Sequence, residues 1–131
     1  MADEPQAVSH FKSKGGLKRL SAALAYSIDG LRTAWRYEHA FRQELMLVVP
    51  GIVVALLLPV SGLERVALIA VLLLVLIVEL LNSAIEAVVD RVSLDRHHLS
   101  KNAKDLGSAA VLLTCVLAAI VWGAIVAPLV F

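Results

Sequence analysis

From Ser108 to Phe131 the sequence carries no charged side chain, and this limits the possible folds more than any other feature. A helix crosses the roughly 30 Å hydrocarbon core of a bilayer with about 20 such residues. Two further apolar runs lie between Leu45 and Val89. The charged residues within those runs are Glu64, Arg65, Glu79 and Glu86. With 60% hydrophobic residues, the chain is therefore predicted to be an all-α membrane protein with three spans, not a soluble globular domain.

The expected organisation is a disordered leader at 1–16 and one membrane domain at 17–131. Apolar residues recur every three or four positions from Leu17 to Trp35 with basic residues between them, which predicts an amphipathic interfacial helix at 17–40. Spans are expected at 42–60, 64–90 and 108–131, joined by a cytoplasmic loop at 91–107. The first span is short and contains Pro50 and Pro59.

The distribution of basic residues predicts the orientation. Seven Lys and Arg residues precede the first span, four lie between the second and third, and only Arg65 lies in the turn between the first and second. Cytoplasmic segments carry the excess of positive charge, so the N-terminus should be cytoplasmic and the C-terminus should lie on the outer side.

Four polar residues, Glu79, Asn82, Glu86 and Asp90, interrupt the second apolar run. Their spacing places them within an arc of roughly 80° on one helix face. A span that begins near residue 66 leaves the hydrocarbon near residue 85, so Glu86 is expected at the boundary and Glu79 about 9 Å deeper.

A carboxylate at that depth should be paired, protonated or catalytic, because burial away from water disfavours its charged form. Glu79 is thus a candidate general base for an apolar substrate's hydroxyl, or alternatively a hydrogen-bonding group between helices. Glu86 and Asp90 could hold Mg²⁺ with nucleotide phosphates, although Asp90 could equally be a solvated helix end. Asn82 could orient Glu79 or bond a neighbouring helix.

Residues 79–91 (ELLNSAIEAVVDR) resemble the signature of the bacterial integral-membrane diacylglycerol kinase family. Glu38 and residues 30–35 and 40–44 resemble its interfacial helix and first-span junction, and 103–111 resembles the entry to its last span. The resemblance implies a homotrimer in the bacterial inner membrane with active sites between subunits. It also implies MgATP as phosphoryl donor and diacylglycerol as acceptor.

By the same resemblance, Glu79 would be the base, and Glu38 and Glu86 would bind the metal. Asn82 is grouped with Glu79 as a candidate catalytic residue. Nucleotide contacts would come from Arg19, Tyr26, Glu38, Glu86, Asp90, Asp95, Arg96, His97, Lys104 and Asp105. Lipid contacts would come from Arg19, Ala23, Leu24, Ala25, Ser27, Ile28, Arg32, Trp35, Ala40, Phe41, Arg42, Gln43, Glu44, Glu79 and Ser108. Without the family, the loop charges would be read as positive-inside residues and the apolar positions as ordinary packing.

Two alternatives remain at this point. A kinase of the same fold acting on undecaprenol would share the catalytic residues, although Arg42 to Glu44 favours diacylglycerol. A small non-catalytic carrier would explain the polar face but would not require Glu38 or the Lys104 and Asp105 pair. No P-loop spacing is present, and no nucleic-acid partner is expected.

Overall fold

The computed structural model describes residues 15–131, and this part of the chain forms four α-helices. They are α1 (Gly16–Tyr37), α2 (His39–Leu57), α3 (Gly62–Val92) and α4 (His98–Val130). The predicted all-α class is therefore confirmed for this part of the chain. Residues 1–14 of the predicted leader lie outside the described residues, and Gly16 already belongs to α1.

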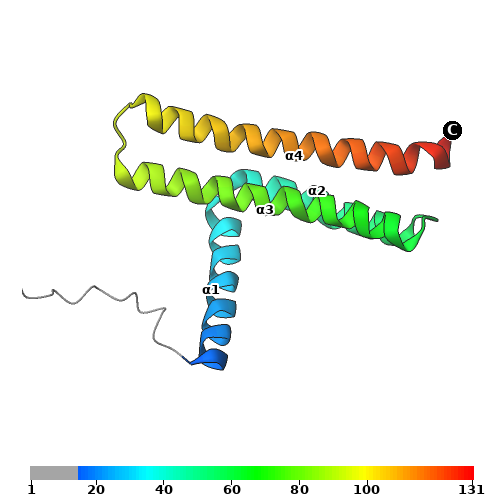
Figure 1. Ribbon diagram of the computed structural model, residues 1–131, viewed down its shortest axis with the longest axis horizontal. Helices are drawn as coiled ribbons and strands as arrows, with labels where there is room; N and C mark the ends of the chain where they lie inside the picture. The colour runs from blue at the N-terminus through cyan, green and yellow to red at the C-terminus, as the bar shows by residue number, and fades with distance from the viewer. Residues whose placement is uncertain (1–14) are drawn as a thin grey trace, which may run out of the picture.

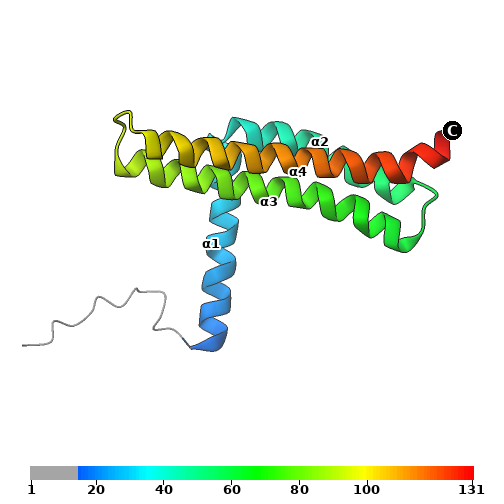
Figure 2. The same cartoon turned by 45° about the horizontal axis from the view of Figure 1, so that its top comes forward.

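Helices α2, α3 and α4 run side by side in one bundle, and α1 projects crosswise from it (Figures 1 and 2). Each bundle helix is long and apolar enough to cross a membrane, as predicted. In both views, the connected ends of α3 and α4 extend beyond the point where α1 joins the bundle. The C-terminus lies at the opposite end.

The last helix begins about three turns earlier than predicted, so the segment 91–107 is mostly helix and not loop. Only residues 93–97 lie outside α3 and α4. His97 caps α4 because its Nδ1 accepts a hydrogen bond from the Leu99 amide at 3.2 Å. Lys101 and Asp105 then form an ion pair one turn apart. These polar contacts support a helix in a segment that hydropathy alone does not identify.

The first two helices meet at Glu38, whose extended backbone ends α1 three residues before the predicted boundary. Arg42 holds this elbow: its Nη1 donates to the carbonyls of Trp35 at 2.9 Å and Arg36 at 3.1 Å, and its Nη2 lies 2.8 Å from His39 Nδ1. The carbonyls at the end of a helix need such partners. Arg42 thereby fixes α1 crosswise to α2.

The turn between α2 and α3 is held by a capping box and by Arg65. Ser61 N donates to Glu64 Oε2 at 2.8 Å, and Glu64 N donates to Ser61 Oγ at 3.2 Å. The Arg65 guanidinium donates to the carbonyls of Ala55 at 3.1 Å and Leu58 at 3.0 Å. The end of α2 is thus tied to the start of α3.

The bundle buries few large side chains and exposes many. Leu68 is fully buried and its carbonyl accepts a hydrogen bond from Trp122 Nε1 at 3.2 Å, which ties α4 to α3. Leu57, Leu63 and many similar residues are largely exposed. An apolar exterior of this kind suits contact with lipid or with other membrane helices.

Replacing Arg65 with Ala should lower the thermal unfolding midpoint in detergent. The variant loses two hydrogen bonds from a charged donor, which should lower the free energy of unfolding by about 1.5–3 kcal/mol. Circular dichroism at 222 nm measures the change, with Arg91→Ala at the exposed far end of α3 as the matched control. Equal midpoints for the two variants would show that Arg65 does not hold the turn.

Candidate active site

Two of the three buried polar residues of the described chain lie one turn apart on α3. Glu79 is 4% exposed and Asn82 is 9% exposed. Farther along the same face, Glu86 is half-buried and Asp90 is exposed. Along the polar face predicted from spacing, solvent exposure therefore increases from the bundle interior toward the connected ends of α3 and α4.

Asn82 links this face to α4. Its Nδ2 donates to Glu86 Oε1 at 3.2 Å, while its Oδ1 is buried with no hydrogen-bond partner in the part of the chain that the structure describes. Gly107 of α4 lies directly against that oxygen. The carboxamide is thus held between a carboxylate on its own helix and the backbone of the next one.

The elbow adds two more carboxylates to the acids of α3. The charges of Glu38 and Glu86 both act on Glu79, and Glu79 and Glu44 also interact electrostatically. Glu44 Oε2 is buried without a hydrogen-bond partner among residues 15–131. Like charges gathered in a partly buried site repel one another unless a cation or a proton intervenes.

None of the ion pairs of the described chain includes one of these four carboxylates; the three that form are Arg32–Asp29, Lys101–Asp105 and Lys104–Asp90. Within residues 15–131 no three metal-binding side chains stand close enough to form a site made of protein ligands alone. Mg²⁺ usually takes one or two carboxylates and completes its shell with water and phosphate oxygens. Glu38 and Glu86, each of which acts electrostatically on Glu79, offer the one or two carboxylates that such an ion needs.

A pocket of about 580 Å³ lies between the connected ends of α3 and α4. Lys104 Nζ spans it to Asp90 Oδ1 at 2.7 Å. Its lining includes most of the predicted nucleotide contacts, namely Asp90, Asp95, Arg96, His97, Lys104 and Asp105. Arg19 and Tyr26 do not line it, since they lie on α1, which projects crosswise from the bundle (Figure 1). Glu38 and Glu86 do not line it either.

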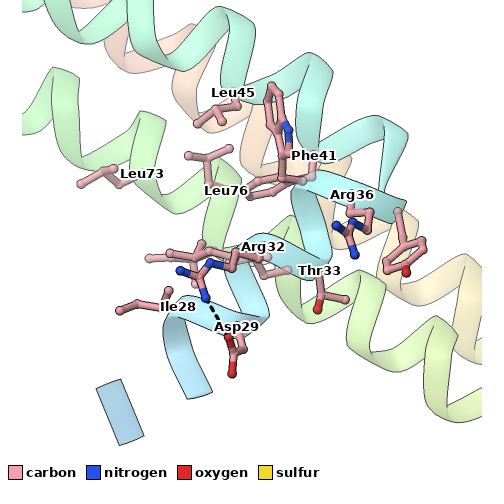
Figure 3. Close-up of a pocket in the computed structure, with 14 residues that line it drawn as sticks. Ile28, Asp29, Arg32, Thr33, Arg36, Phe41, Leu45, Leu73 and Leu76 are labelled. Atoms are coloured by element: carbon pink, nitrogen blue, oxygen red, sulfur yellow. Dashed lines mark hydrogen bonds and ion pairs between the residues drawn. The ribbon is translucent and has the colours of Figure 1, made fainter. Parts of the chain in front are cut away.

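A groove of about 980 Å³ lies where α1 meets α2 and α3 (Figure 3). Four predicted lipid contacts line it: Ile28, Arg32, Trp35 and Phe41. The remaining predicted lipid contacts do not: Arg19, Ala23, Leu24, Ala25, Ser27, Ala40, Arg42, Gln43, Glu44, Glu79 and Ser108. Arg32 Nη1 bonds Asp29 Oδ1 at 3.2 Å at the groove's edge.

The α3 wall of the groove consists of Leu73, Leu76, Ile77 and Leu80, none of which was predicted. No sequence signal distinguishes them, because every apolar residue of a span looks alike until its neighbours are known. Glu79 is the adjacent position to Leu80 but is buried in the bundle and does not line the groove.

A buried acid and amide within a bundle of three membrane-length helices define a small helical membrane protein with a carboxylate-rich site. The chain belongs to the prokaryotic diacylglycerol kinase family, whose family model matches residues 25–126. It is 57% identical over 117 residues to a diacylglycerol kinase of Pseudomonas aeruginosa, covering 89% of this chain and 95% of that protein.

Two more distant relatives carry the same name. A diacylglycerol kinase of Escherichia coli K12 is 52% identical over 107 residues, covering 82% of this chain and 88% of that protein. A diacylglycerol kinase of Haemophilus influenzae is 44% identical over 110 residues, covering 84% of this chain and 93% of that protein. The similarity thus extends over nearly the whole membrane domain.

Replacing Glu79 with Gln should raise the thermal unfolding midpoint in detergent. The amide has nearly the same shape and cannot carry the charge that desolvation and the charges of Glu38 and Glu86 disfavour at this position, a gain of about 0.5–2 kcal/mol. Asp95→Asn, which neutralises an exposed carboxylate, is the control and should leave the midpoint unchanged. A lower midpoint for Glu79→Gln would mean that the carboxylate stabilises the bundle.

Proposed function

We propose that this protein transfers the γ-phosphate of ATP to diacylglycerol, producing phosphatidic acid at the cytoplasmic face of the bacterial inner membrane. The family and the names of its relatives support this activity. The observation that carries it is Glu79, a carboxylate only 4% exposed that lies at the level of the lipid groove and close to the other acids.

Glu79 is the general base of the proposed reaction. Its carboxylate accepts the proton of the lipid's primary hydroxyl as that oxygen attacks the γ-phosphorus. The bond from the γ-phosphorus to the bridging oxygen breaks at the same step, and the electron pair leaves with ADP. Asn82, one turn away, orients the Glu86 carboxylate through its hydrogen bond to Glu86 Oε1.

Glu38 and Glu86 would hold Mg²⁺ beside the phosphates. When bound, the ion neutralises phosphate charge and helps to align the transferred group. The proximity of both carboxylates to Glu79 and the absence of an ion-pair partner for either within the described residues support this assignment. Without a cation, the same two carboxylates would repel the phosphates.

The pocket between the ends of α3 and α4 would receive the nucleotide. Lys104 is the natural phosphate contact, because its ammonium group is held in place by Asp90 at 2.7 Å. Asp90, Asp95, Arg96, His97 and Asp105 line the same pocket and complete this part of the proposed site.

Arg19 and Tyr26 would reach a nucleotide only from another subunit, because α1 projects away from its own bundle (Figure 1). This arrangement supports active sites that lie between neighbouring chains, as the proposed homotrimer requires. Glu38 and Glu86 would complete the nucleotide site through the metal.

The groove at the elbow would receive the lipid. If the bundle crosses the membrane, α1 lies along its surface, since α1 is crosswise to the bundle (Figure 1). The amphipathic helix then covers the lipid near the level of Glu79, with the N-terminus cytoplasmic and the C-terminus periplasmic. The remaining predicted lipid contacts on α1, the elbow and Ser108 would line the entry path.

The direct test incubates detergent-purified protein with [γ-³²P]ATP, Mg²⁺ and either dioctanoylglycerol or undecaprenol. Radiolabelled phosphatidic acid is the expected product, resolved by thin-layer chromatography. Label on the prenol alone would mean that undecaprenol, and not diacylglycerol, is the phosphoryl acceptor. Label on neither lipid would remove the kinase assignment and favour a carrier.

Replacing Lys104 with Met should raise the apparent KM for ATP about tenfold or more, because a charge-assisted contact worth about 1.5–3 kcal/mol is lost. The KM for dioctanoylglycerol should stay within about twofold, since the groove lies elsewhere. Lys18→Met, at the far end of α1, removes the same charge outside the pocket and serves as the control. Equal ATP KM values for the two variants would contradict the role of Lys104.

A further inference from the structure

Gly107 makes the closest contact between α4 and the buried amide of α3. It is itself buried, and a Cβ attached to it would overlap Asn82 Oδ1 and stand 3.2 Å from Asn82 Cγ and 3.8 Å from its Cβ. In glycine that direction is taken by the second α-hydrogen, which therefore faces the amide oxygen. A weak C–H···O contact is the kind of interaction that this approach allows.

A Cβ at Gly107 would press on the Asn82 amide and disturb its orientation. Asn82 is 9% exposed, and its Nδ2 is committed to Glu86 Oε1 at 3.2 Å. Moving Oδ1 away from Gly107 turns the whole planar carboxamide and withdraws Nδ2 from Glu86. Contact with α4 therefore determines which way the amide points.

The other glycines of the bundle helices do not contact Asn82. A Cβ at Gly123, also in α4, would meet nothing within 4 Å. A Cβ at Gly51 would approach only the flexible end of Leu72, with Cδ1 at 2.8 Å. Glycine is unfavourable inside a helix, so its place at 107 calls for a local reason. The chain offers Gly123 as a matched control in the same helix.

We infer that Gly107 is a positioning residue for the phosphoryl transfer: its missing side chain lets the α4 backbone hold Asn82 in the orientation that presents its amide to Glu86. This inference rests on the proposed function for its kinetic consequence. Gly107 touches neither substrate in this scheme and acts only through Asn82.

Gly107→Ala should lower kcat with dioctanoylglycerol by about tenfold to a hundredfold, as expected for a displacement near 1 Å in a reacting site, and leave both KM values within about twofold. Gly123→Ala should keep the wild-type kcat. In an Asn82→Ala background, Gly107→Ala should cause no further loss, because the group through which it acts is absent.

A spectroscopic measurement tests the same contact without turnover. The side-chain amide resonance of Asn82, assigned by its disappearance in Asn82→Ala, should shift in Gly107→Ala and stay in place in Gly123→Ala. The inference is overturned if that resonance does not move, or if Gly107→Ala lowers the residual activity of Asn82→Ala as much as that of the wild type. Absence of lipid phosphorylation by the wild type would instead defeat the proposed function, while the resonance still reports on the contact.

Discussion

The burial of the Glu79 carboxylate is the constraint on which the rest of the structure depends. A carboxyl group 4% exposed in an apolar bundle carries a large desolvation cost when it is ionised, and no ion pair with a described residue offsets that cost. Glu38, Glu44 and Glu86 also interact electrostatically with Glu79, which adds like-charge repulsion. A chain selected only for a stable bundle would gain nothing from these interacting carboxylates, which supports the metal and phosphate site proposed here.

The turn at Glu38, the apolar groove and the Lys104 pocket are arranged around the acids of α3. The hydrogen bonds of Arg42 to the end of α1 hold the turn at Glu38, and the charge of Glu38 acts on Glu79 of α3. The same turn opens the apolar groove beside α3, with the pocket at Lys104 on the far side of the acids. A lipid alcohol and a nucleotide approaching from these two sides would meet near Glu79 and Glu86.

The helical class, the three long apolar helices and the polar face of α3 could be predicted from the sequence, because periodicity and the length of apolar runs reflect local physics. The start of α4 at His98 could not, since its first turns are polar and are held by the His97 cap and by side-chain pairs. The exposure gradient from Glu79 to Asp90 was likewise predictable from spacing. The proximity of Glu38 to Glu79 was not, because it depends on the tertiary turn at the elbow; only the family resemblance pointed to Glu38. Gly107 gave no sequence signal as a site residue, since its significance lies in what packs against it.

The most direct measurement of the central claim compares turnover and binding in Glu79→Gln. The rate of [γ-³²P]ATP-dependent phosphorylation of dioctanoylglycerol should fall by at least about a hundredfold, as for removal of a general base. The affinity for MgATP, measured by equilibrium dialysis on the same preparation, should stay within about twofold. Turnover within a few-fold of the wild type, with nucleotide affinity intact, would show that the buried carboxylate is not the base.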